Sequence, residues 1–415
     1  MKRLLFLSLC MCALVFLTGC CTHSQVAASG EMIDNAGTTY ARDALQGLID
    51  SGNLNGVICV NYKDGLQEIA CLGYADLEAK RPITLDDHFM QCSQTKGFCG
   101  VCIAMLVEEG KLNLDDPVSD YLPEFKTLWV RESGNDDVQT LVKAKNTMTV
   151  RMCLNHTSGT PPEMPNFQEM GGVTRRMPLR SVAATAAAMP LLFEPGTQMK
   201  YSDVGIDIGA AVVEKITGMR WEDFLQERVL GPLEMTETTF WPTEKQLANR
   251  IKLYTVSKGQ PVALRKFDAL FQEPYGDDRV FPSAGGGLWT TARDQYKFYK
   301  MLMNLGVGDN GVRILKEETV KSLLAVSSRP KGLGGYSLGL DAPEEDTEEA
   351  MFGHGGAYTT NCYVNWHKRL LRMLVLQVTG DACLDVFKTA RAAANQFFEN
   401  AYDPNAGVEY TNRLE

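Results

Sequence analysis

The chain has 415 residues, a formal net charge of −10 at pH 7 and 45% hydrophobic residues. This length and hydrophobic content are enough to bury a large core, which excludes a disordered or fibrous protein. No run of basic residues marks a nucleic-acid-binding surface, so we do not expect nucleic acid as a partner.

The first residues have the layout of an export signal. Lys2 and Arg3 precede an apolar run over residues 4–16, which is too short to span a bilayer as a mature helix. The following Leu17-Thr18-Gly19-Cys20 resembles the lipobox of bacterial lipoproteins, in which the cysteine is lipid-modified. A buried N-terminal helix is the alternative, but two positive charges and small residues flank the run as export requires.

From this layout we expect residues 1–19 to be a lipoprotein signal peptide and Cys20 to be the lipid attachment site. Residues 20–37 are mostly small and polar, which is typical of a flexible tether. The protein would then be an exported bacterial lipoprotein, held by its anchor on the periplasmic or cell-surface face of a membrane. The rest divides into one domain over residues 38–405 and a C-terminal tail over residues 406–415.

The twelve cysteines look at first like a disulfide set. Cys10 and Cys12 would leave with the signal peptide, and the others lack the spacing of a disulfide or metal framework. A cysteine in apolar surroundings behaves as a small hydrophobe, so we expect packing in the core. The cysteines in such surroundings are Cys59, Cys71, Cys99, Cys102 and Cys153. The sequence therefore predicts no metal site, and it implies no cofactor.

Apolar periodicity and turn residues predict the elements of the first third of the chain. In chain order they are a helix over 40–49, two strands that turn at Lys63-Asp64-Gly65, and a helix that begins near Ser93, covers 97–109 and stops at Gly110. The Asp-Gly pair is a strong hairpin signal. Residues 112–125 are predicted to form extended turns, and residues 131–147 a surface excursion followed by a short helical turn and a loop.

The middle of the chain is predicted to be mostly helical, and strands return near its end. The predicted helices cover 181–189, 204–217, 221–228, 292–304 and 384–402, and the predicted strands cover 336–340, 357–366 and 370–378. We expect an α+β fold of the α/β sandwich type, in which the N- and C-terminal segments form an antiparallel sheet flanked by helices, with an inserted helical region. Alternating strand-helix-strand units are missing, which disfavours a Rossmann sheet.

A serine and a lysine three residues apart stand at the start of a predicted helix. In "SQTK", Ser93 and Lys96 would share one helix face about one turn apart, so their side chains can touch. A serine hydroxyl needs a neighbour to take its proton, and the helix N-terminus favours developing negative charge nearby. Alone, this tetrapeptide is weak evidence, because serine is also a common helix cap.

Further motifs strengthen the hypothesis of a serine nucleophile. They are "VEEGKLNLDDPVSDYLPEF", "TVRMCLNHTSG", "EPGTQMKYSD", "SAGGGLWTTARDQYKF" and "FGHGGAYTTNCYVNW". In this order they resemble the serine beta-lactamase and penicillin-binding protein family, in particular the branch of class C beta-lactamases, DD-peptidases and related esterases. The resemblance runs from about residue 40 to residue 397.

The resemblance implies that Ser93 attacks a carbonyl, that Lys96 and Tyr201 manage its proton, and that an acyl-enzyme forms and is hydrolysed. It implies an oxyanion hole made of the backbone N–H groups of Ser93 and Ala357. A tyrosine beside a lysine ammonium is expected to ionise more easily, so the pair could pass a proton between nucleophile and leaving group.

The resemblance also implies substrate contacts from Asp203, His354, Gly355 and Gly356. Asp203 departs from the family, which usually has asparagine there, and an ionised carboxylate only accepts hydrogen bonds. Its charge is expected to hold Lys96 protonated, which favours Tyr201 as the base and weakens the case for efficient beta-lactam hydrolysis. Capping of the next helix is the alternative role for Asp203.

The histidines and one cysteine offer rival interpretations. His354 stands where many relatives carry lysine and would hold a substrate carboxylate less firmly, although a structural role at the sheet edge stays open. His156 is expected to be structural, and Cys92 to point away from the helix face of Lys96. His88 and His367 are expected at the surface.

Two hypotheses remain. The first is a serine hydrolase of the beta-lactamase-related, carboxypeptidase or esterase type that acts on a D-alanyl peptide, a beta-lactam or a carboxylic ester, with a small molecule or peptide as its substrate. The second is a catalytically impaired penicillin-binding-type lipoprotein that binds cell-wall peptide fragments. The sequence does not predict the natural substrate or the oligomeric state.

Overall fold

The computed structural model describes residues 32–134, 138–164, 176–260, 262–265 and 280–401. The predicted signal peptide, Cys20 and the C-terminal tail lie outside the described residues. The end of the predicted tether is part of the fold, which corrects its boundary. Met32 is 7% exposed within the core, and Asn35 accepts a 2.7 Å hydrogen bond from the backbone N–H of Gln67.

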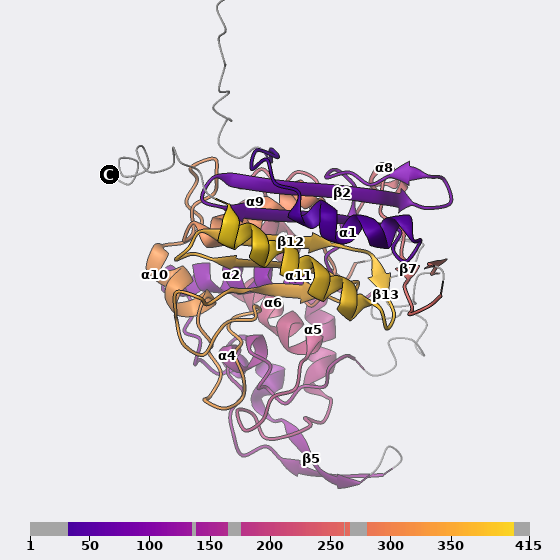
Figure 1. The fold of residues 1–415 in the computed structure, drawn as a ribbon. Helices are drawn as coiled ribbons and strands as arrows, with labels where there is room; N and C mark the ends of the chain where they lie inside the picture. The colour runs from indigo at the N-terminus through magenta and orange to yellow at the C-terminus, as the bar shows by residue number, and fades with distance from the viewer. Residues whose placement is uncertain (1–31, 135–137, 165–175, 261, 266–279, 402–415) are drawn as a thin grey trace, which may run out of the picture.

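An antiparallel sheet of six strands joins the two ends of the described chain (Figure 1). Its order is β10 (Phe352–Gly356), β11 (Thr360–Asn365), β12 (Leu370–Val375), β1 (Gly56–Lys63), β2 (Leu66–Asp76) and β3 (Arg81–Pro82). The β1–β2 hairpin turns at Asp64 and Gly65, which both have positive φ, as the Asp-Gly signal predicts. Val60 pairs with Ile69 on one side and with Met373 on the other.

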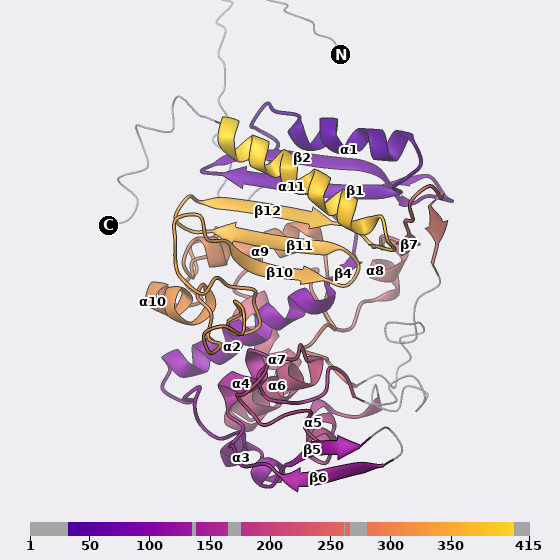
Figure 2. The same ribbon diagram turned by 60° about the horizontal axis from the view of Figure 1, so that its bottom comes forward.

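Helices cover both faces of this sheet. The helices α1 (Tyr40–Asp50) and α11 (Cys383–Asn400) lie on one face, as Figures 1 and 2 both show, while α2 (Thr95–Glu108) and α9 (Ala292–Met303) lie on the other. Alternate residues of β1 point to opposite faces, so Cys59 packs toward α11 and Val60 toward α2. The predicted α+β architecture is therefore confirmed.

The inserted region is mainly helical and lies beyond the β10 edge of the sheet (Figure 2). Its elements are α3 (Val118–Tyr121), α4 (Val150–Leu154), α5 (Leu179–Ala187), α6 (Asp203–Thr217), α7 (Trp221–Leu225) and the hairpin of β5 (Trp129–Gly134) and β6 (Gln139–Lys143). Helix α6 packs against α2, α4 and α5 and is the centre of this region. It begins after the N-cap Ser202 and ends at Gly218, which has φ 70°.

Small elements connect these parts. They are β4 (Phe89–Met90) paired with β9 (Trp289–Thr290), a three-stranded sheet of β13 (Val378–Thr379), β7 (Tyr254–Thr255) and β8 (Ala263–Leu264), and the short helices α8 (Glu244–Ala248) and α10 (Glu317–Thr319). The β4–β9 pair lies directly before the turn that holds Ser93, so it fixes where α2 enters the core.

Several predicted elements differ from the structure. Residues 336–340 form bends rather than a strand, and residues 112–125 include α3 and a 3₁₀ turn over Pro123–Lys126. The predicted strand over 357–366 begins only at Thr360, because residues 357–359 form the turn between β10 and β11. The polar residues 131–147 contain most of the β5–β6 hairpin.

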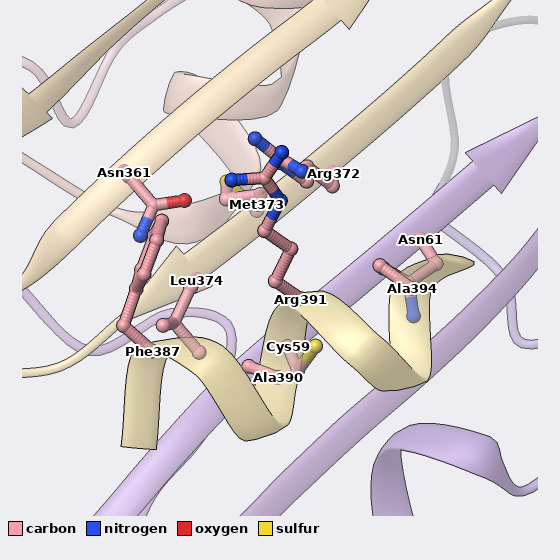
Figure 3. Close-up of a pocket in the computed structure, with 10 residues that line it drawn as sticks. All are labelled: Cys59, Asn61, Asn361, Arg372, Met373, Leu374, Phe387, Ala390, Arg391 and Ala394. Carbon is pink, nitrogen blue, oxygen red and sulfur yellow. The ribbon is translucent and has the colours of Figure 1, made fainter. Parts of the chain in front are cut away.

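A small cavity lies between α11 and the sheet (Figure 3). It is lined by Cys59, Asn61, Asn361, Arg372, Met373, Leu374, Phe387, Ala390, Arg391 and Ala394. It has room for about one water molecule. Since no predicted site residue lines it, this cavity is not the substrate site.

The described residues contain neither a membrane-spanning helix nor a cluster of metal ligands. No helix among them is both long and apolar enough to cross a membrane. No group of three or more histidine, cysteine, aspartate or glutamate side chains in these ranges is arranged to hold a metal ion.

Candidate active site

Ser93 lies in a tight turn at the entrance of α2. The turn is a 3₁₀ helix over Cys92–Gln94, and its first residue, Cys92, has φ 51°, a left-handed conformation that is rare for residues other than glycine. The Gln94 amide donates a 3.0 Å hydrogen bond to the His354 carbonyl of β10. This bond joins the serine turn to the sheet edge, and strained backbone of this kind is concentrated at functional sites.

Lys96 is fully buried and makes three polar contacts. Its Nζ donates a 3.1 Å hydrogen bond to Ser93 Oγ, lies 2.6 Å from an Asp203 carboxylate oxygen, and donates a hydrogen bond to the Gly285 carbonyl. An ammonium has three N–H donors, so these contacts satisfy all of them. The helix spacing of Ser93 and Lys96 therefore brings the two side chains together as predicted.

The charge of Lys96 is set by two opposing effects. Burial alone would lower the pKa of the ammonium, but the interactions with Asp203 and with Tyr201 outweigh it. The net result is a raised pKa. Lys96 is consequently a cation at neutral pH and holds no free lone pair with which to accept the Ser93 proton.

Tyr201 stands over Lys96, immediately before α6. Its ring centroid lies 4.7 Å from Lys96 Nζ, and Lys96 and Ser93 both act on the phenol to lower its pKa. Burial of the phenol raises its pKa, as does Asp203, while Lys96 lowers it; the net pKa is raised. Lys96 thus has the expected effect of easing ionisation of Tyr201, but burial and Asp203 outweigh it.

Asp203 is the first residue of α6 and points back toward Lys96. Its side chain is 40% exposed, so one carboxylate oxygen binds Lys96 while the group also faces solvent. The helix cap is supplied by Ser202, whose hydroxyl accepts a 3.1 Å bond from the Gly205 N–H. Capping is thus not the role of Asp203, and its contact is an ion pair with Lys96.

The β10 edge runs directly beside the serine turn because it contains glycine. A Cβ atom on Gly356 would lie 2.4 Å from the Gln91 carbonyl oxygen and 2.3 Å from Thr360 Oγ1, distances that no side chain tolerates. Gly356 thereby brings Ala357, the next residue, beside Cys92 and Ser93. The backbone N–H of Ala357 lies close to the buried thiol of Cys92, the residue directly before Ser93.

His354 is 5% exposed, and both of its ring nitrogens are engaged. Nε2 lies 2.9 Å from the Tyr336 hydroxyl, and Nδ1 lies against the Gly355 carbonyl. Burial lowers the pKa of the ring, as does Lys96, although Asp341 opposes this. The ring is consequently uncharged at neutral pH and offers no positive charge to a substrate carboxylate.

His156 is fully buried and has no contact with Ser93. Its Nδ1 accepts a 3.2 Å hydrogen bond from the Ser202 N–H, and its ring lies 4.3 Å from the Tyr201 ring and 4.5 Å from that of Tyr336. Burial lowers the pKa of this imidazole well below its usual value. These contacts are those of a residue that supports the site.

The remaining candidate residues take no part in the contacts among Ser93, Lys96 and Asp203. Cys92 packs in a buried apolar cluster, and burial raises the pKa of its thiol to about 12. All eight cysteines among the described residues are free, and the five predicted core cysteines are buried or half-buried. His88 is 4% exposed and lies 3.1 Å from Glu237, so its predicted surface position is wrong. His367 is partly exposed and bonds to Asp346.

Two residues of the site were not predicted. Gly285, within "SAGGG", supplies the carbonyl that Lys96 contacts, and Asp207 in α6 binds the turn that contains Gly285. The signal for Asp207 was an aspartate in the otherwise apolar run that follows Asp203. The signal for Gly285 was a run of three glycines, which marks close approach of backbones.

Comparisons with known proteins show the family of the chain. The Beta-lactamase family model matches residues 41–394. The chain is 29% identical over 341 residues to Protein Rv1367c of Mycobacterium tuberculosis, covering 76% of this chain and 82% of that one. It is 26% identical over 348 residues to lovastatin esterase of Penicillium rubens, covering 78% and 83%.

Solved structures share the fold at low identity. The LovD6 mutant of simvastatin synthase (LovD) from Aspergillus terreus superposes with a TM-score of 0.71 at 21% identity, covering 91% of this chain and 99% of that one. EstCE1, a hydrolase with promiscuous acyltransferase activity, gives 0.69 at 20% identity, covering 86% and 97%.

The fold and the family match define a hydrolase of the beta-lactamase fold, a class whose relatives include proteins named as an esterase and as an acyltransferase. The chain belongs to the Beta-lactamase family, whose model covers most of its length.

Proposed function

We propose that the protein is a serine acyl hydrolase that forms an acyl-enzyme on Ser93 and hydrolyses a small carboxylic ester. One observation carries this proposal: Ser93 Oγ lies 3.1 Å from Lys96 Nζ, and the Tyr201 ring stands 4.7 Å from the same nitrogen. A nucleophile within hydrogen-bond reach of a proton partner, beside a fixed cation, is the arrangement that acyl transfer needs.

The protonated state of Lys96 favours Tyr201 as the base. Lys96 is held as an ammonium by Asp203 and donates to its neighbours, so it stabilises negative charge but does not accept a proton. In the reactive form Tyr201 is a phenolate. It takes the Ser93 proton while Oγ bonds to the ester carbonyl carbon.

The tetrahedral intermediate then collapses and releases the alcohol. The backbone N–H groups of Ser93 and Ala357 would stabilise its oxyanion. Tyr201 returns the proton to the leaving alcohol oxygen, the C–O bond of the ester breaks, and the acyl group stays on Ser93. Water attacks the acyl-enzyme with the same phenolate as base, which releases the acid and restores Ser93.

The charge pattern around Ser93 favours a neutral ester over a D-alanyl peptide or a beta-lactam. Both of those substrates carry a carboxylate. Two buried or half-buried cations of the described part of the site are already engaged: Lys96 by Asp203, and Arg329 by a 2.7 Å bond to the Asn155 carbonyl and by the Tyr336 ring. His354 is uncharged, and the open side of the site carries the Asp203 carboxylate, which repels an anionic substrate.

A catalytically impaired penicillin-binding-type protein that captures cell-wall peptide fragments is the second candidate. The observation in its favour is the same Asp203–Lys96 pair, since a lysine that stays protonated slows acylation and deacylation alike. Such a protein would be labelled by penicillin at Ser93 yet turn over no substrate.

Active-site labelling separates these outcomes. The mature protein and Ser93→Ala are treated with a fluorophosphonate and, separately, a fluorescent penicillin, and turnover of short-chain nitrophenyl esters, a D-Ala-D-Ala peptide and a chromogenic cephalosporin is measured. We expect fluorophosphonate labelling and ester turnover that both depend on Ser93. Penicillin labelling without any turnover would support the binding protein, and absence of labelling by either reagent would refute the serine mechanism.

We also propose that the protein is anchored by a lipid on Cys20 after export, on the basis of the lipobox-like sequence. Membrane fractionation of wild type and Cys20→Ala tests this, and we expect the variant to move to the soluble fraction. Unchanged partition into the membrane would refute the anchor.

A further inference from the structure

A second carboxylate lies one helical turn beyond Asp203, on the same face of α6. Asp207 is 5% exposed, and its Oδ1 accepts a 3.1 Å hydrogen bond from the Gly285 N–H and a 3.2 Å bond from the Ser283 hydroxyl. A buried carboxylate is costly unless it is well bonded, so these partners explain how it is tolerated. These hydrogen bonds of Asp207 reach neither Ser93 nor Tyr201.

The turn that Asp207 binds is part of the Lys96 environment. The Gly285 carbonyl accepts a hydrogen bond from Lys96 Nζ, while its N–H is held by Asp207 on the other side of the same residue. A Cβ on Gly285 would lie 2.7 Å from Asp203 Cβ. Gly285 therefore lies between Asp203 and Asp207 of α6 and Lys96 of α2, and it contacts all three.

The other end of this turn is fixed to α2. The Leu288 N–H donates a 3.2 Å bond to Thr95 Oγ1, next to Lys96, and the Gly287 N–H donates to the Ser283 carbonyl within the turn. Because both ends are tied, the Gly285 carbonyl has one orientation as long as Asp207 accepts from its N–H. Release of that bond would free the Ala284–Gly285 peptide, which is joined through the Gly285 Cα to the peptide that carries the carbonyl, and would let the carbonyl turn away from Lys96.

We propose that Asp207 is a positioning residue for acyl transfer: it holds the Ser283–Gly287 turn so that the Gly285 carbonyl keeps Lys96 in contact with Ser93. This inference rests on the proposed function, because Asp207 would position Lys96 for that acyl-transfer reaction.

The charges that face Asp207 agree with such a role. Burial raises the pKa of its carboxyl to about 7, with repulsion from Asp203 as a further cause; the backbone N–H groups of Gly285 and Ala284 and the Lys96 ammonium lower it. Cys99 on α2 faces it as well and stays a neutral thiol, because burial raises its pKa. Asp207 thus changes its charge near neutral pH, and a protonated carboxyl accepts the Gly285 bond less strongly.

Three variants test the proposal. Asp207→Asn keeps the shape but removes the charge, Ser283→Ala removes only one partner of Asp207, and Glu68→Gln is the matched control. Glu68 is a 2% exposed carboxylate that accepts a 3.1 Å bond from the Ala41 N–H beside α1, away from Ser93. For each, kcat and KM for a nitrophenyl ester are measured from pH 5.5 to 8.5, with the fluorophosphonate labelling rate and the melting temperature.

We expect Asp207→Asn to lower kcat about tenfold or more with little change in KM, and Ser283→Ala to have a smaller effect in the same direction. The ratio of wild-type to Asp207→Asn activity should fall as the pH drops from 8 to 6, because only the wild type has this carboxyl to protonate. Glu68→Gln should lower the melting temperature and leave kcat and the pH profile unchanged.

Two results would overturn the inference. One is a ratio that stays constant over the whole pH range, which would mean a merely structural carboxyl. The other is a crystal structure of Asp207→Asn in which Lys96 keeps its bonds to Gly285 and Ser93. The crystal structure needs no turnover, so it tests the positioning role of Asp207 independently of catalysis. A wild type that is never labelled at Ser93 would instead refute the proposed function.

Discussion

Lys96 Nζ lies closer to the Asp203 carboxylate, at 2.6 Å, than to the Ser93 hydroxyl, at 3.1 Å. The lysine is fully buried, while the Asp203 side chain is 40% exposed, so solvent screens this attraction in part. The serine hydroxyl therefore stands beside a positive charge and not beside a free base. The predictions for Asp203 and Gly285 depend on this ion pair.

Replacement of Asp203 by asparagine is expected to move the pH dependence of ester hydrolysis to lower pH. In the wild type the raised pKa of Tyr201 means that the phenolate fraction, and with it kcat/KM, increases with pH between 7 and 9. Asp203 raises the pKa of both Tyr201 and Lys96, so its removal lowers both. We expect Asp203→Asn to shift the rising limb of kcat/KM by about one pH unit or more toward acid.

The matched control for this change is Asp115→Asn. Asp115 also pairs with a cation, Arg151, at 2.7 Å, but its side chain is 64% exposed and away from Ser93. This variant should reproduce the wild-type profile. A rising limb that stays in place in Asp203→Asn would mean that neither Tyr201 nor Lys96 controls the proton of Ser93.

The sheet could be predicted because its signals are local. The Asp64-Gly65 turn fixes the β1–β2 hairpin, and apolar periodicity marks α2 and α11 without knowledge of their partners. The strand predicted over 336–340 does not form, and the reason is physical. Tyr336, Leu338 and Leu340 alternate like a strand, yet Leu338 and Leu340 are buried because they press on Gly100 and Gly97 of α2.

The site was predictable only where its residues form a local motif. Ser93 and Lys96 are three positions apart, and Tyr201 and Asp203 share one short segment. The bond from Gly285 to Asp207 spans 78 positions, and it exists because α6 packs beside the 283–287 turn. Sequence spacing does not predict a contact over such a separation. The contacts that hold Gly285 beside Lys96 could therefore be identified only from the structure.

Addition of one methyl group at Gly285 is expected to disturb the ion pair. The Cβ of Gly285→Ala would lie 2.7 Å from Asp203 Cβ and 3.1 Å from its Cγ, so the carboxylate must move away from Lys96. We expect a loss of about 1–3 kcal/mol in the free energy of unfolding and a fall in kcat of about tenfold or more. Urea unfolding and ester kinetics measure the two effects.

Gly47→Ala is the control for the added methyl group. Gly47 lies on an exposed face of α1, and a Cβ there would meet no heavy atom within 4 Å. Alanine is the better helix former, so this variant should gain about 0.5–1 kcal/mol in stability with unchanged kcat. Full activity in Gly285→Ala would show that the contact between Gly285 and Asp203 is unimportant for the reaction.

Cys92 is expected to be inert although it is the neighbour of Ser93. Burial raises the pKa of its thiol to about 12, so the thiolate that reacts with alkylating agents is about 10⁻⁴ of the population at pH 8. Iodoacetamide should therefore leave ester hydrolysis unchanged in wild type, and Cys92→Ala should retain fluorophosphonate labelling. Inactivation by iodoacetamide with alkylation mapped to Cys92 by mass spectrometry would contradict this prediction.

His156 is expected to matter through the tyrosine that it supports. Its ring lies between those of Tyr201 and Tyr336, and its Nδ1 accepts from the Ser202 N–H, directly before α6. His156→Asn tolerates the φ of 66° at this position but removes the ring, and His156→Ala removes the acceptor as well. We expect both to lower kcat, and the alanine variant to lose about 1–3 kcal/mol more stability, because it leaves a buried N–H without a partner.

The pH dependence distinguishes support from direct proton transfer by His156. Burial lowers the pKa of its imidazole well below the usual value, so the ring is neutral throughout the neutral range and contributes no inflection there. The fall in kcat should accordingly be equal at pH 6, 7 and 8. His88→Asn, at another buried histidine that lies 3.1 Å from Glu237, should leave kcat unchanged. An inflection near pH 6.5 that disappears in His156→Asn would instead make His156 an acid or base in the reaction.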